Sequence, residues 1–139
     1  MTRVWSGQRS LEKRLKGITS ARGQKQLGAA LFAIGEDVAT YAQISITRGA
    51  VSGRGHVPSK PGRPPSADTH VLADNIEVTQ PAVDEVIVAS NAPYSVPLEF
   101  GTSKMEARPF FRPAREAKKK EARAKFAKAV DRIVKGSAD

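Results

Sequence analysis

A run of helix-breaking residues between positions 49 and 67 divides this chain of 139 residues into two parts. The breakers are Gly49, Gly53, Gly55, Pro58, Pro61, Gly62, Pro64 and Pro65. Glycine and proline at this density preclude both a helix and a central strand. We therefore expect an extended loop here, and a loop of this length in a small domain is usually functional or disordered.

The segment before this loop has the spacing of a long helix. Its recurring apolar residues are Leu27, Ala30, Leu31, Ile34, Val38, Tyr41 and Ala42. The spacing predicts a helix from about Gln24 to Arg48. Gly28 and Gly35 each weaken such a helix by up to about 1 kcal/mol, but they permit another element to approach closely. Upstream, residues 10–17 predict a short helical turn that Gly17 ends.

The second part of the chain begins with an alternating pattern. Ile76 and Val78 alternate with polar residues, residues 80–84 have turn composition, and residues 86–88 form a second apolar run. This pattern predicts a β-hairpin. Two strands alone are marginally stable, so either a helix covers them or further strands extend the sheet, including strands of another subunit.

The last segment, from about Pro113 to Lys135, predicts a second long helix. Its apolar stripe consists largely of small residues: Ala114, Ala117, Ala122, Phe126, Ala129, Val130 and Ile133. Residues 1–139 therefore read as a single α+β domain. It contains a long N-terminal helix, the extended loop at 49–67, a β-hairpin or small antiparallel sheet, and a long C-terminal helix.

Charge is unevenly distributed along the chain, whose formal net charge is +9. Residues 1–63 have a net charge of +8, residues 64–103 of −6, and residues 104–139 of +7. Such blocks allow attraction between unlike surfaces, and the basic ends allow contact with nucleic acid. The candidate phosphate contacts on the last helix are Lys118, Lys119, Lys120 and Arg123. The alternative for these residues is a solvated helix face without a partner.

The sequence offers no arrangement of residues for catalysis. The chain has no cysteine and only two histidines, which excludes thiolate zinc sites, disulfides and a three-histidine metal site. Asp68 and His70 could donate two metal ligands, although an incidental histidine beside a turn explains them better. We expect no enzymatic activity, cofactor or metal. The chain also contains no apolar run long enough to span a membrane, and its first residues lack the apolar stretch that a signal peptide would have, so we expect neither.

Two motifs resemble the signature of one phage protein family. The first reads Asn-Ala-Pro-Tyr at 91–94, Leu-Glu-Phe-Gly-Thr-Ser-Lys-Met at 98–105 and Ala-Arg-Pro-Phe-Phe-Arg-Pro-Ala at 107–114. The second is Pro-Gly-Arg-Pro-Pro at 61–65, followed by Asp68, Thr69, Leu72 and Ile76. Together they resemble the family of the tenth gene product of phage HK-ninety-seven, whose members are neck, head–tail connector or tail-completion proteins. The order of the predicted elements agrees with that family as well.

The resemblance implies a structural virion protein of a tailed phage or prophage. Such a subunit would form a homo-oligomeric ring, expected to be sixfold, between the capsid's portal assembly and the tail tube, with the DNA passing through the lumen. It would assemble in the bacterial cytoplasm, with other neck, portal-side and tail-tube proteins as partners and no membrane. The motif residues expected at the interface are Pro64, Pro65, Asp68, Thr69, Leu72, Tyr94, Glu99, Phe100, Gly101, Thr102, Pro109, Phe110, Phe111, Arg112 and Pro113. The rival hypothesis is a small basic DNA-binding protein without sequence specificity.

Several motif residues have a local expectation. Gly101 and Thr102 should form a tight turn, and Pro97 should make its segment extended or kinked. Phe110 and Phe111 should anchor the last helix against the hairpin, either as core residues or as partner contacts. Glu99 could pair with Arg108, with Arg112 or with a neighbouring subunit.

Overall fold

The structure, a computed structural model, describes residues 6–48, 58–62 and 71–136. Four of the motif residues, Pro64, Pro65, Asp68 and Thr69, lie outside this described part, as does most of the expected loop. The elements are α1 (Ser6–Thr19), α2 (Ala21–Thr47), α3 (Val71–Asp74), β1 (Ile76–Ala82), β2 (Glu85–Ser90), α4 (Ser95–Phe100) and α5 (Phe111–Gly136). The fold is α+β, as the sequence predicts.

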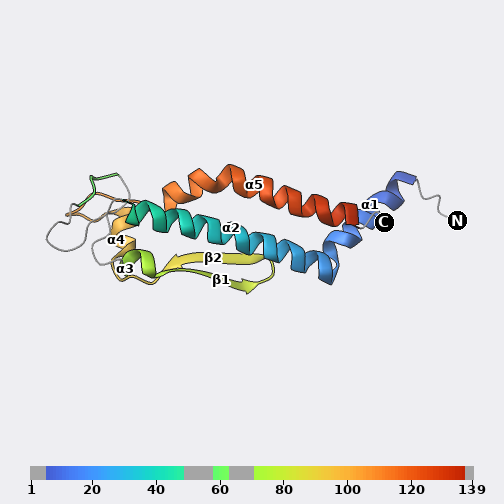
Figure 1. Ribbon diagram of the computed structural model, residues 1–139, viewed down its shortest axis with the longest axis horizontal. Coiled ribbons are helices and arrows are strands. Elements are labelled where there is room, and N and C mark those ends of the chain that lie inside the picture. The colour runs from blue at the N-terminus through green and yellow to red at the C-terminus, as the bar shows by residue number, and fades with distance from the viewer. Residues whose placement is uncertain (1–5, 49–57, 63–70, 137–139) are drawn as a thin grey trace.

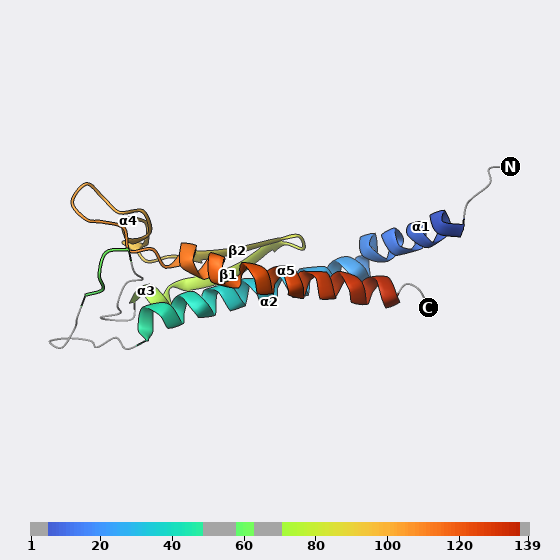
Figure 2. The ribbon, with the colours of Figure 1, turned by 90° about the horizontal axis from the view of Figure 1, so that it is seen from above.

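The long helix α2 is the central element of the molecule. It lies between α5 and the β1–β2 hairpin, whereas α3 and α4 gather at its C-terminal end and α1 projects beyond its N-terminal end (Figure 1). Seen from above, α5 still runs alongside α2, so the two helices are neighbours over most of their length (Figure 2). Lys125 of α5 donates a hydrogen bond to Asp37 of α2 and links the two helices.

Two glycines on α2 explain how the hairpin approaches this helix. Gly28 and Gly35 are both buried and lie two helical turns apart on one face. A Cβ at Gly35 would come within 2.6 Å of the Val86 side chain, and one at Gly28 within 2.9 Å of the Val83 carbonyl oxygen. The Gln80 amide donates a hydrogen bond of 2.9 Å to the Gly28 carbonyl oxygen. The element that packs closely against the two glycines of α2 is therefore the hairpin.

The hairpin has one covered face and one open face. Its strands pair antiparallel, with Val78 opposite Val88 and Thr79 opposite Ile87, and the register shifts before Ala82. Val78 and Val88 pack against the core, whereas Thr79 and Ile87 are exposed. Within the described residues the sheet contains these two strands alone. The predicted hairpin is confirmed, although its strands extend further toward the turn than the sequence suggests.

Two local expectations were wrong. The predicted turn at 10–17 is part of a helix of 14 residues, which continues through Gly17 to Thr19. Ser20 ends it instead, since its N–H donates to the Lys16 carbonyl oxygen while its hydroxyl caps α2. The segment around Pro97 is helical, because Pro97 lies in the first turn of α4, where a missing N–H costs no hydrogen bond.

The core lies mainly where α2, α3, β1, α4 and α5 meet. Phe110 and Ile46 are the largest fully buried side chains, and they pack with Leu72, Ala73, Ile76, Ala92 and Ala114. Phe110 therefore has the core role expected for it, and Phe111 is half-buried beside it with ring centroids 4.5 Å apart. The apolar stripe predicted for α5 is only partly buried, because Ala117 and Phe126 are exposed.

Candidate functional site

The carboxylate of Glu99 caps the N-terminus of α5. Its Oε2 accepts hydrogen bonds from the backbone N–H groups of Phe110 (2.8 Å) and Phe111 (3.1 Å), and its Oε1 accepts one from Arg112 (2.9 Å). The first N–H groups of a helix have no partner within the helix, and the helix dipole favours a negative charge there. Glu99 satisfies both requirements from a different helix.

The two partners within the chain that were expected for Glu99 were therefore wrong, whereas the pairing with a neighbouring subunit stays a prediction. The sequence suggested an ion pair with Arg108 or Arg112, or with a neighbouring subunit. Within the described part of the chain, Glu99 forms neither ion pair, and the Nε of Arg108 is buried without a hydrogen-bond partner. The Arg112 backbone, rather than its guanidinium, binds the carboxylate.

A tight turn brings the two ends of this contact together. Gly101 has φ of +78°, and its N–H donates to the Pro97 carbonyl oxygen at 2.7 Å. A Cβ at Gly101 would lie 2.9 Å from the backbone nitrogen of Ala107, so both its conformation and its surroundings require glycine. Thr102 then pairs with Met105, with its N–H donating at 2.8 Å to the Met105 carbonyl oxygen. The turn expected at Gly101 and Thr102 is confirmed.

We call residues 95–112 the α4–α5 joint. The Arg108 N–H donates to the Leu98 carbonyl oxygen at 2.6 Å, which holds the returning strand of the turn against α4. Together with the Glu99 cap, this bond fixes the direction in which α5 leaves the joint. The joint therefore connects a short helix, a turn and a long helix into one unit.

A groove of about 660 Å³ lies beside the joint. It runs between β2 and the first turns of α5, with Val38, Val88 and Phe110 among its apolar lining and Arg112 and Arg115 on its α5 side. At its α4 side, Val96 is 64% exposed and Phe100 is 78% exposed. Exposed apolar residues gathered in this way mark an interaction surface.

The remaining described motif residues divide between the core and the surface. Leu72 is buried in the core, and Pro113 lies in the first turn of α5. Pro109 is half-buried, and Tyr94 precedes α4 with its side chain exposed. Leu72 lies in α3, Tyr94 directly precedes α4, and Pro109 and Pro113 flank the first residue of α5; Figure 1 shows these elements meeting at one end of the molecule. The structure thus brings the described motif residues to one end of the molecule.

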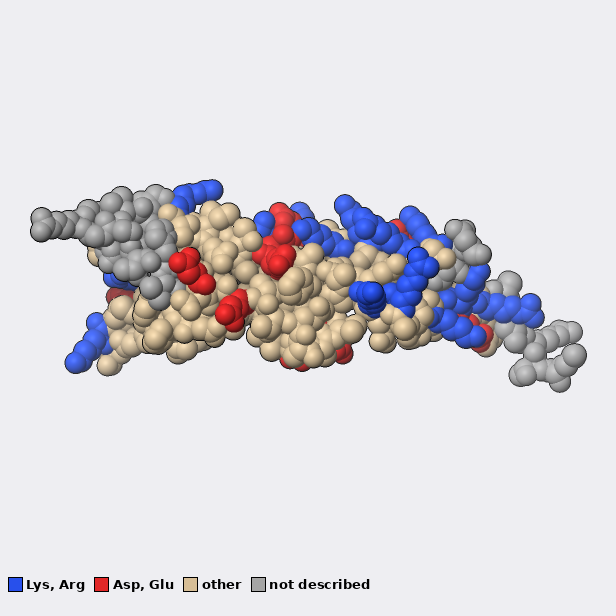
Figure 3. Space-filling model, turned by 60° about the horizontal axis from the view of Figure 1, so that its bottom comes forward, with Lys and Arg blue, Asp and Glu red and all other residues tan. Residues whose placement is uncertain are grey.

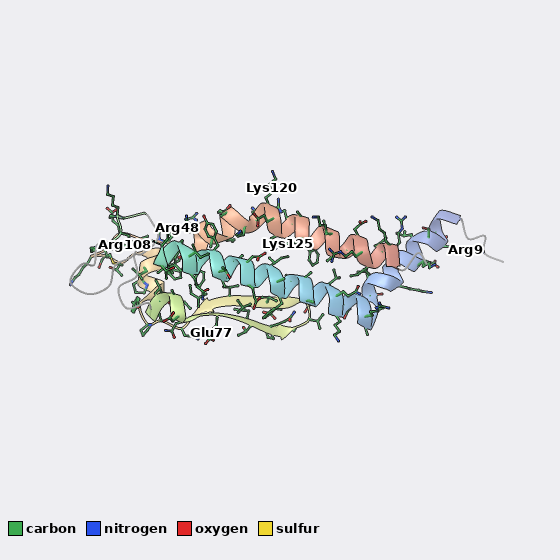
Figure 4. All side chains as sticks on the ribbon, viewed as in Figure 1. Arg9, Arg48, Glu77, Arg108, Lys120 and Lys125 are labelled. Carbon is green, nitrogen blue, oxygen red and sulfur yellow. The ribbon has the colours of Figure 1, made fainter. Side chains whose placement is uncertain are left out.

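The four basic residues expected to contact phosphate do not share one direction. The Lys118 ammonium lies 5.7 Å from the centre of the Tyr41 ring and donates to Glu121 at 3.2 Å, so Lys118 is held on the side of α5 that faces α2. Lys119, Lys120 and Arg123 are exposed. Figure 4 shows Lys120 pointing away from α2 and Lys125 lying between the two helices.

A larger basic surface lies at the opposite end of the molecule, and sequence reasoning missed it. We call it the basic end; it combines α1 and the start of α2 with the last turns of α5. Its cations are Arg9, Lys13, Arg14, Lys16, Arg22, Lys25, Lys128, Arg132 and Lys135. Figure 3 shows Lys and Arg gathered at this end. Arg22 and Arg132 also line a second groove there, of about 680 Å³.

The basic end combines segments about one hundred residues apart in the sequence. Each segment alone has the composition of an ordinary solvated helix. The one available signal in the sequence was the pair of positive blocks at the two ends of the chain. The fold was needed to show which lysines and arginines meet.

The described residues contain no group of three or more His, Cys, Asp or Glu side chains placed to hold a metal ion. None of the described helices is both long enough and apolar enough to cross a membrane. Comparison of the chain with protein-family models, with curated proteins and with solved structures finds no match.

Proposed function

We propose that this protein is a non-enzymatic structural subunit of a tailed phage or prophage neck. In this role, copies form a ring that joins the capsid's portal assembly to the tail tube, with the DNA in the lumen. The protein would be part of the virion after assembly in the bacterial cytoplasm.

The α4–α5 joint is the observation that carries this proposal. The residues by which the chain resembles the neck family include Glu99, Gly101 and Thr102, and these are the residues whose contacts form the joint. The motif thus corresponds to one folded unit rather than to scattered similarities. Because each of these three residues makes a contact that holds the joint together, the resemblance has a physical basis.

The surface of the subunit also suits assembly. Val96, Phe100 and Ile87 are large apolar side chains that are 64%, 78% and 43% exposed. Such exposed side chains do not stabilise a monomer in water. A neighbouring subunit could bury them, with a favourable free energy of about 25 cal/mol per Å² of apolar surface buried. The molecule is elongated, with distinct ends and faces available for different neighbours (Figure 1).

The test is the mass of the purified protein, measured by multi-angle light scattering at low and moderate salt. We expect a discrete multimer near six or twelve copies, which negative-stain electron microscopy should show as a ring. Where the protein alone is monomeric, it should bind portal-side or tail-tube proteins in a mixture. A chain that stays monomeric and binds neither partner is not a neck subunit.

DNA binding without sequence specificity is a second candidate function, and the basic end favours it. Nine exposed cations gather at one end of the molecule, where Lys135 also bonds Asp131, and such a group would attract phosphates with an affinity that falls steeply with salt. The test is the anisotropy of a labelled DNA duplex between about 50 and 200 mM salt. Absence of binding at the lowest salt concentration would remove this function.

A further inference from the structure

The open face of the hairpin is acidic with an apolar centre. Glu77 lies opposite Ala89 and Thr79 opposite Ile87, and all four are exposed. Glu85 follows the same alternation and is exposed as well. Figure 4 shows Glu77 pointing away from α2. Residues 76–90 include no lysine or arginine, so no positive charge of the hairpin itself balances Glu77 and Glu85.

The groove beside the α4–α5 joint has the complementary character. Its lining includes Val38, Val88 and Phe111, and Arg112 and Arg115 stand on one side. Glu99 also faces this groove, but its carboxylate is already bound by three backbone N–H groups of α5. The charges of the two guanidinium groups therefore dominate the surface that a partner would meet.

The arginine side chains are available for a partner. Arg115 bonds Glu116 at 3.0 Å, but both side chains are more than half exposed, and an ion pair so exposed to solvent contributes little to stability. This hydrogen bond from Arg115, followed by the charge of Lys119, lowers the pKa of the Glu116 carboxyl. Exchanging Glu116 for a carboxylate of a partner would cost little.

From this complementarity we infer that the open hairpin face of one copy docks in the groove of the next copy. Ile87 meets the apolar lining, while Glu77 and Glu85 face Arg112 and Arg115. The inference rests on the proposed function, in which copies of the chain associate, and it names the two surfaces through which they do so. A second copy is the partner that fits, because the chain's own acidic block supplies the charge that the groove lacks.

The relative placement of the two surfaces favours a ring. The groove is bordered by the side of β2 that carries Val88 and Ser90, whereas the docking face is the opposite side of the same sheet. One copy can therefore use both surfaces at once, toward two different neighbours. Such head-to-tail contacts are heterologous, and they close into a ring when the rotation between copies permits.

Charge reversal on each surface tests the inference. One double variant is Glu77→Lys with Glu85→Lys, and the other is Arg112→Glu with Arg115→Glu. Either variant alone should need at least about tenfold more protein to associate, because like charges then face each other. An equimolar mixture should associate as the wild type does, because each contact again joins unlike charges. Sedimentation velocity over a concentration series measures all three.

Matched controls reverse the same charges elsewhere on the surface. Glu12→Lys with Glu36→Lys, and Lys120→Glu with Arg123→Glu, should associate like the wild type. Circular dichroism shows that each variant keeps its helices.

Three outcomes overturn the inference: double variants that associate normally, a mixture that does not regain association, or a wild type that stays monomeric at every concentration. In the first two cases the wild-type multimer persists, so the ring proposal survives with other surfaces. In the third, binding to portal-side or tail-tube proteins decides the proposed function separately.

Discussion

Glu99 is the residue on which the α4–α5 joint depends most. One carboxylate accepts three backbone hydrogen bonds at the start of a helix of 26 residues. Charge-assisted bonds of this kind are stronger than those between neutral groups, and their loss leaves N–H groups of a half-buried turn without partners.

We expect Glu99→Ala to lower the free energy of unfolding by about 2 kcal/mol, the loss typical of a charged helix cap. Glu99→Gln keeps one acceptor oxygen but loses the charge, so its effect should be smaller. Urea denaturation followed by circular dichroism measures both. Equal stability of Glu99→Ala and the wild type would mean that water replaces the cap.

Gly35 lies where the central helix packs tightly against the hairpin. Although alanine favours a helix by up to about 1 kcal/mol over glycine, a Cβ here would lie 2.6 Å from the Val86 side chain. We expect Gly35→Ala to destabilise the protein by about 1 to 3 kcal/mol, as overpacked cores do. Gly7→Ala, with nothing within 4 Å of its Cβ, is the control and should be neutral or stabilising. Thermal denaturation separates the two variants.

At the residue scale, the sequence predicted roles that depend on local backbone conformation. The turn at Gly101 and Thr102 was expected from the resemblance, and the positive φ of Gly101 is one that glycine permits. The role of Glu99 was missed because its partners are backbone N–H groups, which every residue but proline has and which no sequence pattern distinguishes. The sequence therefore suggested charged side chains as the partners of Glu99.

At the scale of elements, Ser20 is the single residue that separates α1 from α2. Its hydroxyl accepts a hydrogen bond from the Gly23 N–H at 3.0 Å, and its backbone conformation is extended. A Cβ at Gly23 would overlap the Gly17 carbonyl oxygen, so the chain packs tightly at this junction. The direction in which α1 projects is set here.

We expect Ser20→Ala to cost about 1 kcal/mol, the usual effect of removing an N-cap. The amide of Gly23 should lose its protection against hydrogen exchange, while amides in the middle of α2 should keep theirs. Ser45→Ala is the matched control, since the Ser45 hydroxyl donates to the Ala42 carbonyl oxygen within the helix and caps nothing. Unchanged exchange at Gly23 would show that the hydroxyl is not needed.

Periodicity predicted the long elements well because their buried faces repeat over many residues. The two long helices and the hairpin were found in this way. The short helix α4 was missed because proline generally disfavours a helix. Proline is tolerated in a first turn, but the sequence alone did not show at which residue α4 begins. The end of α1 was misplaced because Gly17 and Ser20 are both plausible stops.

At the scale of the whole molecule, the fold separates the basic end from the α4–α5 joint. The two lie at opposite ends of α2 (Figure 1). A contact with DNA and a contact between copies could therefore occur on one subunit without competing for the same surface. The sequence indicated the charge blocks but not this separation, which depends on how α1 and α5 pack.

We expect the basic end to dominate any binding of DNA. Replacing Lys13, Arg14 and Arg132 by glutamine should reduce the slope of log affinity against log salt by up to about 3, since each phosphate contact contributes about 0.9. Lys119, Lys120 and Arg123 form the comparison set of equal charge. A larger loss from the comparison set would place the phosphate contacts on the middle of α5 instead.

The position of the core residues along the chain also sets an order of events during synthesis. Ile46 and Leu72 belong to the same core cluster as Phe110 and Ala114, which are translated later. At a translation rate of about 5 to 20 residues per second, roughly 3 to 14 s pass between the synthesis of Ile46 and that of Ala114. The groove includes residues of α5, so it cannot form before the start of α5 has been synthesised. Copies that use it must therefore meet after that point in synthesis.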